Sequence, residues 1–76
     1  MVKSIHSKEY TEFAKKLWSA RMEVGLTQVE VAKKLKKPQS YISKSEAGEQ
    51  RLDILEVQRF AKLYGKDICY FLPKKK

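Results

Sequence analysis

The chain has 76 residues, a formal net charge of +8, one cysteine and one histidine. That length predicts one domain with a single modest core. Cys69, as the lone cysteine, excludes an internal disulfide, and the sequence has no Cys/His cluster of the kind that binds zinc.

The positive charge points to a polyanionic partner. Lysine and arginine together number 17, against 9 aspartates and glutamates. Such a field suits nucleic acid first and an anionic membrane surface second, and the least specific interpretation is solubility alone. No apolar run approaches the ~18 residues of a membrane span. Because residues 1–10 also lack the apolar stretch of a secretory signal and a lone cysteine fits a reducing compartment, we expect a cytoplasmic, nucleoid-associated protein.

Sparse glycine and proline favour helices joined by short turns. The first helix is predicted over residues 8–24, with Ser7 as its cap and Gly25 at its end. Its inward face is predicted from residues that recur at helical spacing: Tyr10, Phe13, Ala14, Leu17, Arg21 and Val24. A second, short helix begins with a capping box formed by Thr27 and Glu30 and ends near residue 35 or 36. Its predicted inward residues are Val31, Ala32 and Leu35.

The third helix is predicted from Pro38 to about Ala47, where Gly48 ends it. Proline suits a first turn because its missing N–H needs no partner there. A helical wheel places Ile42 and Ser45 on the core side. The opposite face carries no acid and consists of Gln39, Ser40, Ser43, Lys44 and Ala47. An amide on this face can bond the edge of adenine in a major groove, and the hydroxyls and the ammonium can reach base edges or phosphates.

Asp53 is predicted to cap a fourth helix that reaches Tyr64 and is ended by Gly65. Its predicted inward residues are Ile54, Val57, Phe60, Ala61 and Tyr64. A last short helix starts near Asp67 and stops before Pro73. Its predicted inward residues are Ile68, Phe71 and Leu72.

These five helices predict an all-α, compact domain over residues 1–76, with a core at about 8–72 and flexible ends at 1–6 and 73–76. The amino end of the second helix displays N–H groups near Gln28 that suit a phosphate. A short helix across the DNA backbone, followed after a tight turn by a helix in the groove, is the helix-turn-helix arrangement.

The stretch GLTQVEVAKKLKKPQSYISKSEAGE, residues 25–49, resembles the phage-repressor and Cro-like (XRE-like) helix-turn-helix family of bacterial regulators. The resemblance continues through RLDILEVQRFAKLYG and DICYFL and covers roughly residues 12–72. It implies a five-helix repressor-type fold. Three positions depart from the family pattern: Lys36 replaces the glycine of the turn, Ser45 replaces a large apolar residue, and Ala47 replaces a polar one. A left-handed Lys36 would cost about 1–2 kcal/mol.

The resemblance also implies roles for individual residues. The base-reading positions are Gln39, Ser40, Ser43 and Lys44. Gln28 matches the family glutamine that opens the second helix and contacts a phosphate. Besides this family match, we also expect phosphate contacts at Thr27, Lys37, Tyr41 and Arg51, although Lys37, Tyr41 and Arg51 could equally face solvent. Arg21 and Glu46 are expected to form a salt bridge between the first and third helices. Tyr70 and Leu55 are expected at a dimer contact, but they could instead cover the rim of the core, as could Trp18 and Leu63.

We therefore expect a sequence-specific transcriptional regulator, a repressor that binds a palindromic operator in double-stranded DNA as a homodimer. The alternative is an antitoxin or adaptor whose main partner is another protein. An enzyme is not expected, because the sequence shows no nucleophile–base pair and no phosphate-cradling glycine loop. No cofactor or metal is expected, and an RNA-binding role lacks the usual aromatic platform. His6 is expected to have no role, and Cys69 is expected to be half-buried.

Overall fold

The computed structural model describes residues 8–72, which contain four α-helices, one 3₁₀-helix and no strand. The elements are α1 (Lys8–Val24), α2 (Gln28–Leu35), α3 (Gln39–Glu46), α4 (Ile54–Tyr64) and the 3₁₀-helix η2 (Ile68–Phe71). The all-α class is confirmed, and the predicted fifth helix is the short 3₁₀-helix. The expected cap at Ser7, the bystander His6 and the expected flexible ends lie outside the described residues.

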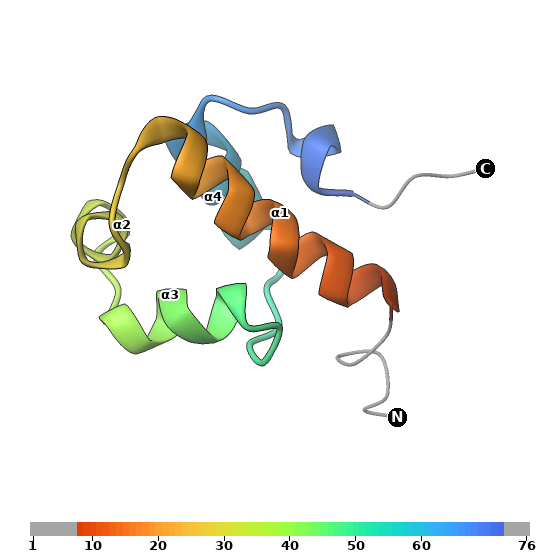
Figure 1. Cartoon of the computed structure of the whole chain (residues 1–76), viewed down its shortest axis with the longest axis horizontal. Helices are drawn as coiled ribbons and strands as arrows, with labels where there is room; N and C mark the ends of the chain where they lie inside the picture. Colours follow the sequence, from red (N-terminus) through yellow and green to blue (C-terminus); the bar gives the residue numbers. More distant parts are fainter. Residues whose placement is uncertain (1–7, 73–76) are drawn as a thin grey trace.

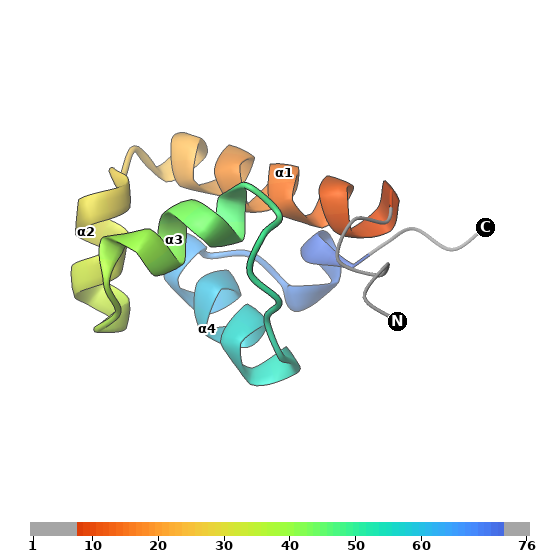
Figure 2. The ribbon, with the colours of Figure 1, turned by 90° about the horizontal axis from the view of Figure 1, so that it is seen from below.

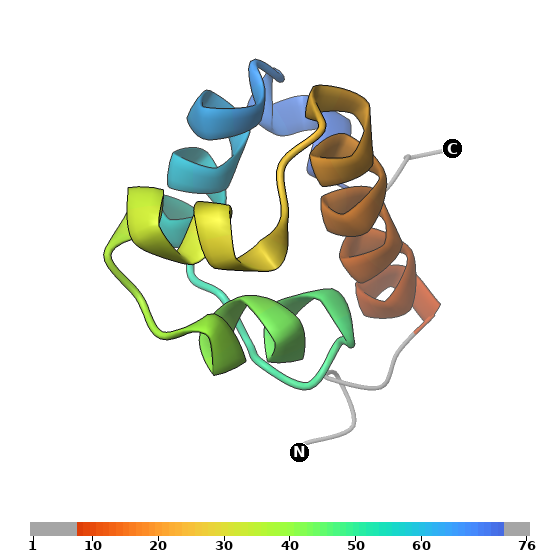
Figure 3. The same ribbon diagram turned by 60° about the vertical axis from the view of Figure 1, so that its left-hand side comes forward.

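α1 is the longest helix, and α3, α4 and η2 all pack against it (Figure 1). α2 packs on α3, and Figure 3 shows these two helices together in front of α1 and α4. After α4 the chain turns back and η2 returns to α1, as Figure 2 shows. The helix-turn-helix unit of α2 and α3 is therefore held by α1 on one side and by α4 on another. None of the helices in residues 8–72 is long and apolar enough to cross a membrane.

Local hydrogen bonds fix the ends of α2 and α4 where the sequence predicts them. Thr27 and Glu30 form the expected capping box, with N···O distances of 2.8 and 3.1 Å. Asp53 and Glu56 form a second capping box, at 2.9 Å for both bonds. Each box satisfies two of the N–H groups that a helix start leaves without a partner.

The core is apolar, and all four α-helices contribute to it. Its buried hydrophobic residues are Phe13, Ala14, Leu17, Ala20, Val31, Ala32, Leu35, Ile42, Val57, Phe60, Ala61, Tyr64 and Phe71. Three residues predicted to face inward are instead exposed: Val24, Ile54 and Leu72. Each lies at the first or last position of its element or just beyond it, where helical spacing continues but no neighbouring element covers the side chain.

α3 is one residue shorter at each end than predicted. Pro38 is the N-cap in an extended conformation, with φ −67° and ψ 153°, so the helix begins at Gln39. The ring of proline fixes φ but leaves ψ open, which makes an extended cap as compatible with it as a helical first turn. Ala47 is the C-cap, and Gly48 follows with φ +78°. This glycine supplies the positive φ that the end of the helix requires.

Candidate nucleic-acid interface

α3 has one fully buried side and one exposed side. Ile42 and Ser45 are 0% exposed, as the helical wheel predicts. The residues on the opposite side are all exposed: Gln39, Ser40, Ser43, Lys44 and Ala47. The predicted outward face is therefore present, and it offers an amide, two hydroxyls and an ammonium to a partner.

Ser45 and Tyr41 anchor the buried side of α3. The Ser45 hydroxyl donates to the Tyr41 carbonyl at 2.7 Å, which satisfies a polar group that is buried under the helix. The Tyr41 ring stacks on Phe60 with centroids 6.1 Å apart, and its hydroxyl donates to Glu56 Oε2 at 3.1 Å. Burial, followed by this bond to Glu56, raises the pKa of Tyr41. The phenol of Tyr41 is thus turned toward α4.

A buried ion pair joins α1 to α3, as the resemblance implies. Arg21 Nε lies 2.7 Å from Glu46 Oε2, and Arg21 Nη2 lies 2.9 Å from Glu46 Oε1. The two side chains are only 9% and 5% exposed. Arg21 Nη1 also donates to the Leu26 carbonyl at 3.0 Å, so one guanidinium ties α1, the segment before α2 and the end of α3 together. The Glu46 carboxylate raises the pKa of Arg21 above its usual value.

The two candidate DNA-contacting glutamines are bonded to each other. Gln39 Nε2 donates to Gln28 Oε1 at 3.3 Å, and Gln28 Nε2 donates to Glu46 Oε1 at 3.1 Å. Neither contact was foreseen from the sequence. Both join residues that are far apart in the chain, and the spacing of residues along the sequence does not predict such a contact.

The turn between α2 and α3 contains the expected left-handed lysine. Lys36 has φ 59° and ψ 47°, and it is the only non-glycine residue with a positive φ between residues 8 and 72. Its N–H and that of Lys37 both donate to carbonyls of the last turn of α2, at 3.2 Å to Lys33 and 2.9 Å to Ala32. These bonds close the helix in a Schellman-type motif, which requires a left-handed residue at this position.

The remaining candidate phosphate contacts lie at the edges of this unit. Thr27 is exposed at the start of α2, where its hydroxyl oxygen accepts from Glu30. Lys37 Nζ lies 4.9 Å from the centroid of the Tyr41 ring, a cation–π arrangement. Arg51 is exposed in the segment between α3 and α4. Lys37 therefore lies over the Tyr41 ring, and both residues are half-buried.

The two candidate dimer residues differ in their surroundings. Leu55 is 65% exposed on the first turn of α4. Tyr70 is half-buried against Phe71, with ring centroids 4.9 Å apart. Two ammonium groups lie over its ring, Lys66 at 4.6 Å and Lys16 at 5.8 Å from the centroid. Leu55 presents an apolar surface, whereas lysines cover the face of Tyr70.

Cys69 is exposed, so the prediction that it is half-buried is wrong. Its backbone N–H donates to Asp67, which caps η2, and the Asp67 carboxylate raises the pKa of the thiol. A raised pKa disfavours the reactive thiolate. Among residues 8–72 there is no group of three or more His, Cys, Asp or Glu residues that could hold a metal ion.

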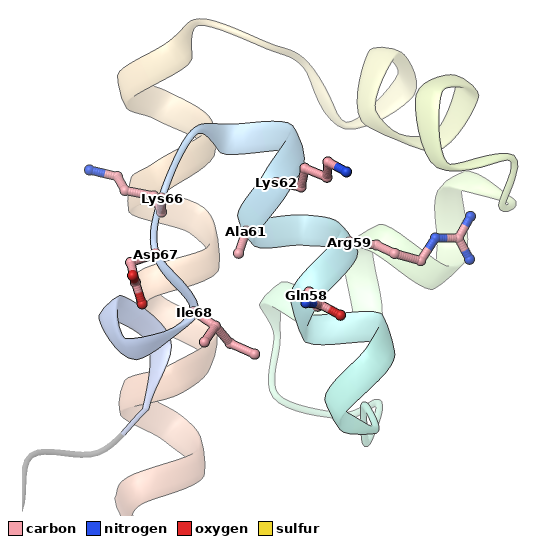
Figure 4. A pocket seen from close by; sticks show the side chains of 7 residues that line it. All are labelled: Gln58, Arg59, Ala61, Lys62, Lys66, Asp67 and Ile68. Atoms are coloured by element: carbon pink, nitrogen blue, oxygen red, sulfur yellow. The ribbon is translucent and has the colours of Figure 1, made fainter.

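A pocket with three basic residues in its lining lies between α4 and η2. This open pocket of about 580 Å³ is lined by Gln58, Arg59, Ala61, Lys62, Lys66, Asp67 and Ile68, as Figure 4 shows. Lys66 is already paired with Glu23, at 2.7 Å, and Arg59 donates weakly to the Leu35 carbonyl at 3.4 Å. All seven lining residues belong to α4, to the segment that leads into η2 or to the start of η2, and none belongs to α3.

Comparisons with known proteins agree with this geometry. A family model described as helix-turn-helix matches residues 19–71. A solved structure titled as the DNA-binding domain of BldD has the same fold, with a TM-score of 0.77 and 24% sequence identity over 88% of this chain and 99% of that one. A search of curated proteins finds no match. The chain belongs to the phage-repressor and Cro-like (XRE-like) helix-turn-helix family of DNA-binding transcription regulators.

Proposed function

We propose that the protein is a sequence-specific regulator that inserts α3 into the major groove of its operator. The observation that carries this proposal is the division of α3 into a buried side and an exposed polar side that lacks acidic residues. Gln39, Ser40, Ser43 and Lys44 contact base edges. The amide of Gln39 contacts adenine, because adenine presents one acceptor and one donor that match it.

Thr27, Gln28, Lys37 and Arg51 hold the domain on the phosphate backbone. Thr27 and Gln28 lie at the start of α2, where N–H groups of the first turn favour an anion. Tyr41 supports Lys37 through its ring and makes no phosphate contact of its own, since its hydroxyl is bonded to Glu56. We therefore propose this supporting role for Tyr41 instead of the phosphate contact expected from the sequence.

Phosphate contacts by charged and neutral residues differ in their salt dependence. Lys37→Ala should flatten the slope of log K against log salt concentration by roughly one unit, because a phosphate-bound lysine releases counterions. The neutral Gln28→Ala variant should lower affinity and barely change that slope. Titrations at several salt concentrations separate the two. An unchanged slope for Lys37→Ala would remove this lysine from the interface.

We further infer a homodimer that represses by occupying a palindromic operator, with half-sites about 10 base pairs apart centre to centre. The exposed Leu55 supports a contact at the start of α4, with Tyr70 as a second candidate. Leu55→Glu should weaken cooperative binding to the full operator and leave binding to a half-site unchanged. Tyr70→Glu is a poorer test, because the new carboxylate would pair with the two lysines over the ring.

The antitoxin or adaptor alternative is favoured by one observation. Trp18 and Met22 lie four residues apart on α1, hence on one face, and are 51% and 47% exposed. Exposed large apolar side chains of this kind fit a protein partner. Binding to a protein that survives high salt, together with DNA binding too weak to select a sequence, would favour this second function.

Selection of bound sequences from a random DNA pool tests the proposal. The expected result is a palindromic consensus of two half-sites. A pool that remains random after selection would contradict sequence-specific binding, and a single asymmetric half-site bound at full affinity by one protomer would contradict the dimer.

A further inference from the structure

A chain of hydrogen bonds runs from the core of the protein to the exposed face of α3. At its buried end, Glu46 accepts from Arg21 at 2.7 and 2.9 Å, and the Glu46 side chain is 5% exposed. Glu46 Oε1 also accepts from Gln28 Nε2 at 3.1 Å, and Gln28 Oε1 accepts from Gln39 Nε2 at 3.3 Å. Gln28 is half-buried and Gln39 is exposed.

The chemistry of the buried end gives this series of hydrogen bonds a direction. A carboxylate only accepts hydrogen bonds, whereas a carboxamide has one donor end and one acceptor end. Gln28 must therefore turn its nitrogen toward Glu46 and its oxygen toward Gln39. The reversed amide would place two oxygens without a proton at about the 3.1 Å separation seen here. Gln39 must then turn its nitrogen toward Gln28.

That direction determines what Gln39 presents to a base. One N–H of Gln39 is bonded to Gln28, so its second N–H and its oxygen remain for the groove, with the nitrogen on the side of Gln28. Adenine needs the N–H opposite its N7 acceptor and the oxygen opposite its N6 amino group. An amide turned the other way would place the Gln39 oxygen opposite N7, with two acceptors facing each other, and the Gln39 nitrogen opposite the N6 amino group, with two donors facing each other.

We propose that Glu46 is a positioning residue for base recognition, because its carboxylate, acting through Gln28, fixes which end of the Gln39 amide faces N7 of adenine. This inference rests on the proposed function, in which Gln39 contacts a base. Glu46 thus links two roles, since the ion pair that holds α3 against α1 also orders a side chain on the DNA-facing side. Pre-ordering lowers the entropic cost of binding the correct base.

A positioning role and a purely structural role predict different measurements. Loss of structure lowers the fraction of folded protein, and this weakens binding to every DNA sequence by the same factor. Loss of positioning changes the ratio of two affinities. One is the affinity for the selected operator, and the other is the affinity for an operator in which the base pair that Gln39 contacts (the Gln39 base pair) is replaced. The folded fraction cancels in that ratio, which makes the ratio the quantity to measure.

The first variant is Glu46→Gln in the full chain. Its amide can donate as well as accept, so Gln28 and Gln39 lose their fixed direction. We expect the affinity ratio at the Gln39 base pair to fall roughly two- to tenfold, the effect of ordering one flexible side chain on binding. The matched control is Glu23→Gln, the same substitution in the exposed pair with Lys66, and it should leave the ratio unchanged.

The second variant combines Glu46→Gln with Gln28→Glu, which exchanges the carboxylate and the amide between the two positions. The carboxylate then sits at position 28, where it can accept from the new amide at position 46 on one side and from Gln39 on the other. The direction at Gln39 is restored, although the ion pair with Arg21 remains lost. We expect the ratio to return toward the wild-type value even if repulsion between the carboxylate at position 28 and the phosphates weakens binding to all sequences.

Three outcomes decide the question. A ratio that falls in Glu46→Gln and recovers in the double variant supports the proposal. An unchanged ratio in Glu46→Gln, or a fallen ratio that does not recover, overturns it and leaves sequence-specific DNA binding intact. A wild-type protein without preference at any base pair would instead contradict the proposed function itself.

Discussion

α2 and α4 are built with the same devices at both ends. Each begins with a capping box and ends at a left-handed residue whose N–H donates back to the last turn. The residue after it completes the same motif, Lys37 N to Ala32 O and Lys66 N to Ala61 O, both at 2.9 Å. An ion pair to α1 follows each helix: Arg21–Glu46 joins α1 to α3, the helix after α2, and Glu23–Lys66 joins α1 to the residue just beyond the end of α4.

The two helices differ in the residue that takes the left-handed conformation and in the burial of the ion pair that follows. The left-handed residue is Lys36 after α2 and Gly65 after α4, at φ 59° and 68°. The Arg21–Glu46 pair is buried, whereas the Glu23 side chain of the other pair is 57% exposed. The hydrogen bonds of the cap therefore set the backbone conformation even against the preference of a lysine. Because only the Arg21–Glu46 pair is buried, we expect only this pair to constrain the orientation of its helix.

The largest expected effect separates the two ion pairs. Arg21→Met should lower the free energy of unfolding by about 3–5 kcal/mol, because the Glu46 carboxylate would remain buried without its cationic partner. Glu23→Gln should leave the midpoint of denaturant unfolding nearly unchanged, because its pair with Lys66 is solvated. Chemical denaturation measures both.

Two controls make this result interpretable. Tyr64→Phe removes a buried hydroxyl that has no partner in the described part of the chain, so it should not reduce stability. In a double-mutant cycle, Arg21→Met and Glu46→Leu should show a coupling energy. Simple additivity of the two losses would mean that the residues do not interact.

The next effect concerns the end of α4. Gly65→Lys should cost about 1–2 kcal/mol of stability, because it places a side chain on a left-handed residue. A Cβ at this position would meet nothing within 4 Å, so the loss would report backbone conformation alone. If the variant were as stable as the wild type, the strain assigned to both turns would be absent.

The capping boxes should be equivalent. Thr27→Ala and Asp53→Ala should each reduce stability by about 1 kcal/mol, since each removes the side-chain acceptor of one N-cap. Thermal unfolding compares the two variants directly. A loss confined to one of them would show that the two helix starts are not stabilised in the same way.

The smallest effect is a gain. Lys36→Gly should raise stability by up to ~1 kcal/mol, because relief of the left-handed lysine is partly offset by the greater freedom of glycine in the unfolded chain. The double variant Lys36→Gly with Gly65→Lys should show the two changes adding. A clear loss of stability in Lys36→Gly alone would contradict the strain at this turn.

The sequence predicted the features of the fold that depend on neighbouring residues. The Thr27–Glu30 capping box, the Asp53 N-cap and the exposed face of α3 follow from residue types and spacing within one helix. The left-handed Lys36 was expected from the resemblance, because the family pattern has a glycine at that position. The inward assignment of Val24, Ile54 and Leu72 was wrong, because periodicity continues to a helix end whether or not another element covers it.

The candidate site divides in the same way. The outward residues of α3 were predicted from the helical wheel, and the Arg21–Glu46 pair followed from the resemblance to a family. The bonds that join Gln28 to Glu46 and to Gln39 depend on how α2 packs against α3, and the same holds for Tyr41 and Glu56 across α3 and α4. Tertiary packing brings these residues together, so spacing along the chain could not reveal them.

Base recognition by α3 is tested most directly by whether its outward face distinguishes base pairs. Affinities of the wild type and Gln39→Ala are measured for the selected operator and for operators with one base pair changed at a time. Gln39→Ala should lose about 1–3 kcal/mol on the selected operator and nearly nothing where its base pair is already changed. An equal loss on every sequence would contradict base recognition by α3.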